Sequence, residues 1–121
     1  MDTPEQQLLS VVIPAHNEES GIAHALAVIG EILDGCGMDW EIIVVDDGSS
    51  DRTFDRLREL AKQEARIRGV RFSRNFGKEA ALLAGLNIAK GDAVVTIDAD
   101  LQHPPRLIPE MIAAWRQGAK V

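Results

Sequence analysis

Short apolar runs alternate with segments of helical spacing along this chain, and this alternation limits the possible folds more than any other feature. The runs cover residues 8–13, 41–45, 70–72 and 93–97. In the second run Ile42, Ile43, Val44 and Val45 follow one another without interruption, which is typical of a strand buried on both faces of a parallel sheet. Strands that alternate with helices predict βαβ units. We therefore expect an α/β fold with a mostly parallel sheet flanked by helices.

The segments between the runs predict four helices. The first covers about 20–33 and places Ile22, Leu26, Ile29 and Leu33 on one stripe, with Gly35 and Gly37 ending it. The second covers about 51–64, with Ser49 or Ser50 as its N-cap, and the third about 78–89. Pro104 and Pro105 can open a fourth helix, which ends near Gly118 and buries Ile108, Met111, Ile112 and Trp115.

Length and composition narrow the class of protein. The 121 residues fit one domain, and 13 basic against 19 acidic residues give a net charge of −6, which argues against nucleic acid as the main partner. The single Cys36 excludes an internal disulfide framework. The N-terminus has no signal-peptide pattern and no run is long enough for a membrane helix, so we expect a cytoplasmic setting. The chain stops where the alternation predicts another strand, so we expect it to be the first part of a longer domain, apparently truncated.

Acidic residues follow the predicted strands. In an open α/β sheet, ligands bind at the carboxyl ends of the strands, so these acids share one edge. Carboxylates that lie close together repel one another unless water, hydrogen-bond donors, protonation or a cation relieves the repulsion. The two carboxylates of Asp98-Ala99-Asp100 and the carbonyl oxygen of Gln102 form an all-oxygen set that suits Mg²⁺ or Mn²⁺. The acids expected at this edge are Glu18, Asp46, Asp47, Asp98 and Asp100.

The first strand–helix junction lacks a glycine-rich phosphate loop. Residues 14–19 contain neither G-x-G-x-x-G nor a Walker A pattern, so a metal after the fourth strand is the better candidate for neutralising phosphates. A metal held there would bridge to a diphosphate, and Arg74 and Lys78 supply further positive charge. Glu18, Asp46 and Asp47 can accept hydrogen bonds from ribose hydroxyls or from a base.

Simpler structural roles stay open for several of these residues. Asp47 stands in an ordinary turn sequence, for which a turn role and a ligand role have equal weight. Asn17 is also a candidate helix cap, and Glu18 also complements a helix dipole. Arg74 and Lys78 are also consistent with an exposed basic pair.

Segments 11–19, 44–53 and 98–105 together resemble the family-two inverting glycosyltransferases of the GT-A fold, a Rossmann-like fold that uses nucleotide diphosphate sugars. Segment 73–81 resembles the branch that acts on polyprenyl phosphates. The resemblance implies that Asp46 or Asp47 contacts the base or ribose, and that Arg74 and Lys78 lie near the substrate phosphates. It implies a nucleotide pocket lined by Pro14, Ala15, His16 and Glu18, and an Asp-x-Asp element of Asp98, Ala99 and Asp100 that is catalytic and, with Gln102, holds a divalent metal.

The activity implied is the metal-dependent transfer of a hexose, with inversion, from a nucleotide diphosphate sugar to a dolichyl or undecaprenyl phosphate. Residues 1–121 would be the N-terminal, donor-binding part of one catalytic domain. The parent protein would lie at the cytoplasmic face of the membrane, and an open sheet edge would favour self-association. Three alternatives remain: transfer to a glycan acceptor, a nucleotidyltransferase, and a receiver-type signalling domain, whose acid pair would follow the first strand instead of the second.

Overall fold

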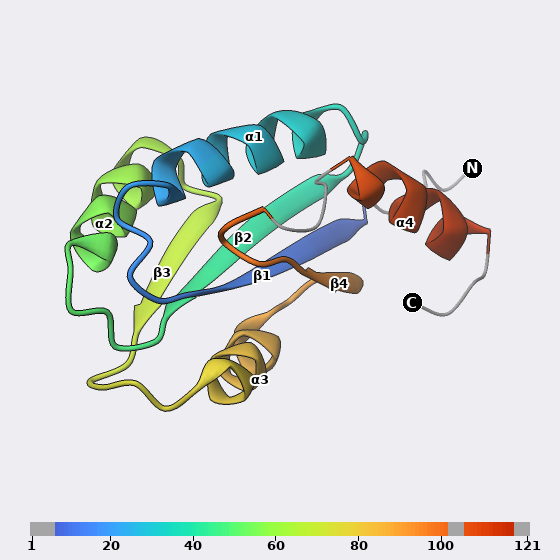
Figure 1. The fold of residues 1–121 in the computed structure, drawn as a ribbon. Helices are drawn as coiled ribbons and strands as arrows, with labels where there is room; N and C mark the ends of the chain where they lie inside the picture. Colours follow the sequence, from blue (N-terminus) through green and yellow to red (C-terminus); the bar gives the residue numbers. More distant parts are fainter. Residues whose placement is uncertain (1–6, 102–105, 118–121) are drawn as a thin grey trace.

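The computed structural model describes residues 7–101 and 106–117. It contains a parallel sheet in the order β3-β2-β1-β4 with helices on both faces (Figure 1). The expected α/β class is therefore confirmed. Along the chain the elements are β1 (Leu8–Ala15), α1 (Ile22–Asp34), β2 (Asp39–Asp46), α2 (Thr53–Gln63), β3 (Ile67–Arg71), α3 (Lys78–Ile88), β4 (Ala93–Thr96) and α4 (Leu107–Arg116).

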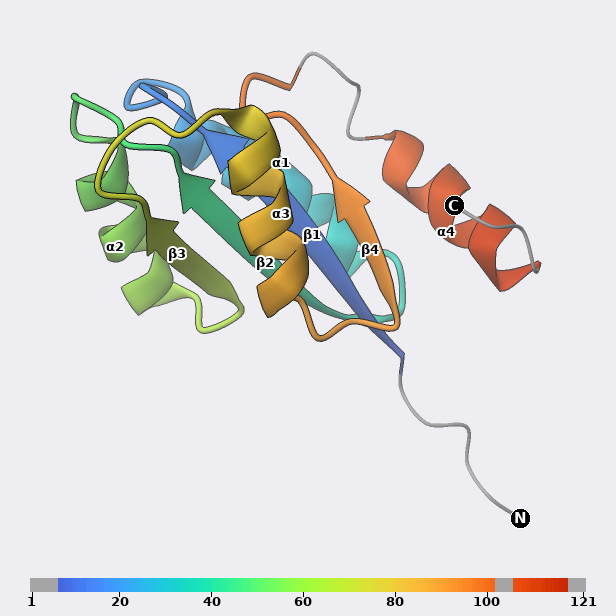
Figure 2. The same ribbon diagram turned by 90° about the horizontal axis from the view of Figure 1, so that it is seen from below.

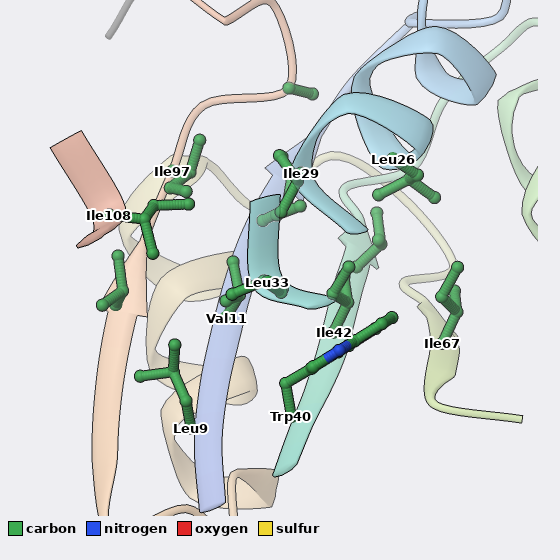
Figure 3. Close-up of a cluster of buried hydrophobic side chains, with 14 of the residues drawn as sticks. Leu9, Val11, Leu26, Ile29, Leu33, Trp40, Ile42, Ile67, Ile97 and Ile108 are labelled. Carbon is green, nitrogen blue, oxygen red and sulfur yellow. The ribbon is translucent and has the colours of Figure 1, made fainter. Parts of the chain in front are cut away.

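One face of the sheet carries α1, α2 and α4. The predicted stripe of α1 is confirmed, since Ile22, Leu26, Ile29 and Leu33 are all buried. They pack on alternate residues of the strands, including Val11 of β1. Figure 3 shows Leu26, Ile29 and Leu33 between helix and sheet. Burying one such side chain fully stabilises a fold by about 1.5–3 kcal/mol. This layer is the main core of the described protein.

The opposite face is covered by α3, which crosses in front of the sheet in Figure 2. It packs on Ile43 and Val45 of β2 through Ala81. A side chain at Gly85 would lie 2.3 Å from Val12 Cγ1, so glycine is what lets this helix approach β1 closely. The small residues of α3 bring its first residue, Lys78, to the end of the sheet where the strands terminate.

The predicted start of the third strand and the predicted cap of the second helix were wrong. The third strand begins at Ile67 and not at Val70, because Ile67 pairs with Ile42 although Arg68 and Gly69 interrupt the apolar pattern. Neither Ser49 nor Ser50 caps α2; the side chain of Asp51 accepts the backbone N–H of Thr53 instead.

Helix α4 buries Ile108 and Ile112, while Met111 and Trp115 are only partly buried. Its predicted opening at Pro104 and Pro105 and its end near Gly118 lie outside the described residues. None of the helices within the described ranges is long and apolar enough to cross a membrane.

Candidate functional site

A cavity of about 230 Å³ lies where the strands end. In Figure 2 the four arrowheads point toward the same edge of the sheet, as expected for parallel strands. The last two residues of β1 line the cavity, together with residues that follow β1, β2 and β4 and the first residue of α3. They are Pro14, Ala15, His16, Glu18, Asp47, Lys78, Asp98, Ala99 and Asp100. The structure thus brings most of the predicted site residues to one wall, from segments far apart in the sequence.

Four carboxylates border this cavity: Glu18, Asp47, Asp98 and Asp100. Burial raises the pKa of Glu18, and the negative charges of Asp100 and Asp51 raise it further, against a lowering effect of His16. Oxygen donors that repel one another in this way suit a hard divalent cation. Within 7–101 and 106–117 no group of three or more His, Cys, Asp or Glu side chains is arranged to hold a metal. The predicted third oxygen, from Gln102, lies outside the described residues.

Lys78 provides the positive charge of the cavity. Its Nζ lies 2.7 Å from Asp98 Oδ1, and this hydrogen bond, with the negative charge of Asp98, raises the pKa of Lys78. The side chain is 60% exposed, so it can turn toward a ligand while staying protonated. Arg74, the other predicted cation, does not line the cavity; its guanidinium lies over the ring of Phe76, 4.7 Å from the centroid.

The two acids after β2 have different surroundings. Asp47 lines the cavity, and its carboxylate accepts the backbone N–H groups of Phe76 at 2.7 Å and Gly77 at 3.0 Å. It therefore holds the loop that leads to Lys78, in addition to any role toward a ligand. Asp46 is fully buried outside the cavity wall; its Oδ1 accepts the N–H and O–H of Ser49, and its Oδ2 lies 4.0 Å from Arg71 Nε.

The ring of His16 is held by hydrogen bonds at both nitrogens. Nδ1 lies 2.9 Å from the carbonyl oxygen of Asp47, which can only accept, so Nδ1 donates. Nε2 lies 3.3 Å from the side-chain amide nitrogen of Asn17 and 3.4 Å from that of Asn75, which can donate to it. These contacts at both nitrogens orient the imidazole at the cavity wall.

Sequence reasoning missed the residues that hold the β1–α1 loop. The backbone N–H groups of Asn17, Glu18 and Glu19 donate in turn to Ser49 Oγ at 2.8 Å, Thr53 Oγ1 at 2.8 Å and Asp51 Oδ2 at 3.2 Å. These N–H groups are thus engaged by protein side chains and cannot form a phosphate nest. The signal was present as a dense polar segment, 49–53, directly after a buried strand.

Two residues of these loops other than glycine adopt the left-handed conformation. Asn17 has φ of 54° and Leu101 has φ of 58°. Asparagine tolerates this region, whereas leucine is strained in it. Leu101 directly follows Asp100, and strained backbone of this kind clusters at functional sites.

Comparisons with known proteins identify the family of this chain. Residues 10–121 match the sequence profile of the family described as "Glycosyl transferase family 2". An uncharacterized glycosyltransferase of Synechocystis is 48% identical over 110 residues, which cover 91% of this chain and 35% of that protein. An undecaprenyl-phosphate 4-deoxy-4-formamido-L-arabinose transferase of Edwardsiella ictaluri is 45% identical over 116 residues, which cover 95% of this chain and 36% of that protein.

Among solved structures, a mannosyltransferase of Pyrobaculum calidifontis in complex with GDP-Man and Mn²⁺ superposes with a TM-score of 0.75 at 27% identity. The match covers 90% of this chain and 32% of that one. The expected GT-A fold is confirmed by this likeness. The chain spans about a third of the length of the curated relatives that it matches.

Proposed function

Because the chain belongs to glycosyl transferase family 2, we propose that its cavity binds the nucleotide diphosphate of a sugar donor. We further propose that the protein transfers the hexose, with inversion, to a polyprenyl phosphate. Residues 1–121 supply the N-terminal, donor-binding part of the catalytic domain. The parent protein works at the cytoplasmic face of the membrane, where such an acceptor presents its phosphate.

One observation carries the donor site: Lys78, Asp98 and Asp100 share a cavity wall with Glu18 and His16, while the nearby backbone N–H groups are engaged elsewhere. Phosphates in this cavity must therefore be neutralised by side chains and by a cation. Asp98 and Asp100 would hold a divalent metal, with Gln102 as the further ligand predicted from the sequence. When bound, such a metal stabilises the negative charge that grows on the leaving diphosphate.

The remaining residues bind and orient. Lys78 can leave Asp98 and bind a phosphate oxygen, since its side chain is exposed and protonated. Glu18 and Asp47 can accept hydrogen bonds from ribose hydroxyls or from a base N–H, and Pro14 and Ala15 form the apolar part of the wall. A phosphate acceptor is already anionic at neutral pH and needs little help from a general base. Catalysis then depends mainly on positioning and electrostatics.

A polyprenyl phosphate is the acceptor that the comparisons favour, because the Edwardsiella relative is named for transfer to undecaprenyl phosphate. A glycan acceptor is the alternative.

Calorimetry on the complete protein tests the donor site. We expect GDP or UDP to bind with Mn²⁺ or Mg²⁺ and to lose most of its affinity in EDTA. Asp100→Asn should weaken metal-dependent binding by about tenfold or more, the size expected for losing a charged ligand. Asp92→Asn is the matched control, because Asp92 accepts the N–H of Leu8 and lies outside the cavity wall. Nucleotide binding that is absent, or equal in Asp100→Asn and wild type, would refute the proposal.

Transfer assays test the acceptor. Radiolabelled sugar should appear in the organic phase when undecaprenyl phosphate is supplied together with the nucleotide sugar that binds. Label on a soluble oligosaccharide, with none on the lipid, would replace the lipid acceptor with a glycan.

A further inference from the structure

The loop between β2 and α2 contacts the loop between β1 and α1 through hydrogen bonds that run in both directions. Ser49, Asp51 and Thr53 offer three side-chain acceptors to the β1–α1 loop, and side chains of that loop accept hydrogen bonds in return. Asn17 Oδ1 accepts the N–H of Ser50 at 2.9 Å, and Glu19 Oε1 accepts the N–H of Arg52 at 2.9 Å. The two loops are therefore held together residue by residue from 17 to 19.

The hydroxyls at the centre of this contact are buried and fixed. Thr53 is fully buried, and its Oγ1 donates to Asp51 Oδ1 while accepting the N–H of Glu18. Ser49 is 7% exposed, and its Oγ donates to the buried Asp46 while accepting the N–H of Asn17. Each hydroxyl thus links a carboxylate on its own loop to a backbone N–H on the other loop.

The segment held in this way carries two residues of the cavity wall, His16 and Glu18. Asn17 lies between them, and its side chain joins the two loops. Glu18 also shares the cavity with Asp100, and repulsion between the two carboxylates favours movement of Glu18 away from the cavity. The loop therefore needs an external restraint to keep both side chains at the wall.

We propose that Thr53 and Ser49 are positioning residues of the donor site, which act on the nucleotide only through the β1–α1 loop. Neither residue lines the cavity, so neither touches a nucleotide bound there. The inference rests on the proposed donor site and adds to it the residues that set its shape.

Thr53→Val tests the inference, because valine keeps the size of threonine and removes the hydroxyl. We expect the Kd of the complete protein for GDP or UDP, with Mn²⁺, to rise about tenfold, as a small displacement of binding groups produces. Thr53→Ser keeps the hydroxyl and should bind like wild type. Ser10→Ala is the matched control: Ser10 is equally buried and accepts the N–H of Gly91 at 2.8 Å, but it lies at the other end of the sheet. It should lower the melting temperature as Thr53→Val does and leave the Kd unchanged.

A mutant cycle separates positioning from a general loss of stability. In a background that lacks both side chains, His16→Ala with Glu18→Ala, the effect of Thr53→Val on the Kd should shrink to less than about twofold, because the side chains that the loop positions are gone. Full additivity of the two effects, or a wild-type Kd in Thr53→Val, would overturn the inference. If Thr53→Val does not fold, Ser49→Ala takes its place in the same cycle. If the wild-type protein binds no nucleotide, the proposed donor site is refuted, which is distinct from a failure of the positioning role of Thr53 and Ser49.

Discussion

The two ends of the parallel sheet use the same kinds of polar residue in opposite ways. At the amino end, Glu41 Oε2 accepts the hydroxyl of Ser10 at 2.6 Å and the N–H of Lys90 at 2.8 Å. At the carboxyl end, Glu18, Asp98 and Asp100 border a cavity. The acid at the first end is held in hydrogen bonds within the fold, whereas the acids at the second end border a cavity that can hold a ligand.

The cluster before β3 extends this contrast. Arg66 pairs with Glu64 at 2.7 Å and Asp34 at 3.2 Å, and its guanidinium lies over the ring of Trp40, 3.8 Å from the centroid. Every charge in that group has an opposite charge or a π-face beside it. The comparison teaches that the presence of acids does not identify a site in this fold; what identifies it is acids from separate strand ends that gather on one cavity wall.

The largest effect should come from Gly48→Ala. Gly48 has φ of +64°, and a Cβ there would lie 2.2 Å from the carbonyl carbon of Arg74 and 2.4 Å from the backbone nitrogen of Asn75. The loop after β2 and the loop before α3 would have to separate, and these loops carry Asp47 and Lys78. We expect the free energy of unfolding to fall by about 3 kcal/mol or more, measured by urea denaturation, together with loss of nucleotide binding.

Gly91→Ala is the control at the amino end. A Cβ at Gly91 would lie 2.5 Å from Ser10 Oγ and 2.7 Å from the carbonyl oxygen of Ala93, so this variant should also be destabilised. Its folded fraction should nevertheless bind nucleotide with the wild-type Kd. Equal loss of affinity in both variants would mean that binding follows stability, and the contrast between the two ends would be lost.

An intermediate effect is expected from Lys78→Gln compared with Arg66→Gln. Both cations lie 2.7 Å from a carboxylate oxygen, but only Lys78 lines the cavity. Removing Lys78 should weaken nucleoside diphosphate binding by about tenfold at low ionic strength and less at high salt, as expected for a charge-assisted bond to phosphate. Arg66→Gln should leave the affinity as it is. A salt-independent loss in Lys78→Gln would show that the lysine acts through structure and not through charge.

The sequence predicted most of this arrangement because its strongest signals are local. Unbroken apolar runs fix which segments are strands, and parallel strands place whatever follows them at one edge. For this reason Glu18, Asp47, Asp98 and Asp100 could be assigned to a common site before any coordinates. The third strand was misplaced because Arg68 and Gly69 carry no strand signal; the segment is a strand because it pairs with β2.

Side-chain direction could not be predicted in the same way. Asp46 and Asp47 are adjacent and chemically identical, yet one is buried beside Ser49 and the other lines the cavity, because successive residues at a strand end point to different sides. Arg74 and Lys78 both follow β3, but Phe76 offers Arg74 a ring to lie on. Such choices depend on contacts between loops that are distant in sequence, and periodicity contains no information about them.

The smallest effect concerns the pKa values of two glutamates, which are shifted in opposite directions at the two ends of the sheet. Burial and the charge of Asp100 raise the pKa of Glu18 above its usual 4.5, whereas hydrogen bonds from Arg66 lower the pKa of Glu64 to about 2. Protonating Glu18 is easier in the folded state than in the unfolded chain, so its contribution to stability grows as pH falls through its raised pKa. The contribution of Glu64 to stability is fully present above pH 4.5, and it is lost as the pH falls toward about 2.

Carboxyl chemical shifts followed by NMR in metal-free buffer should therefore show Glu18 titrating above 4.5 and Glu64 well below it. Glu18→Gln should raise the free energy of unfolding near pH 7 by roughly a few tenths of a kcal/mol, since Glu18 is only half-buried and solvent screens its charge. Glu64→Gln should instead lower stability slightly near pH 7 and flatten its decline in acid. If both acids titrate on the same side of pH 4.5, the electrostatic environments of Glu18 and Glu64 do not differ in sign. The proposal that a cation binds in the cavity then loses its electrostatic support.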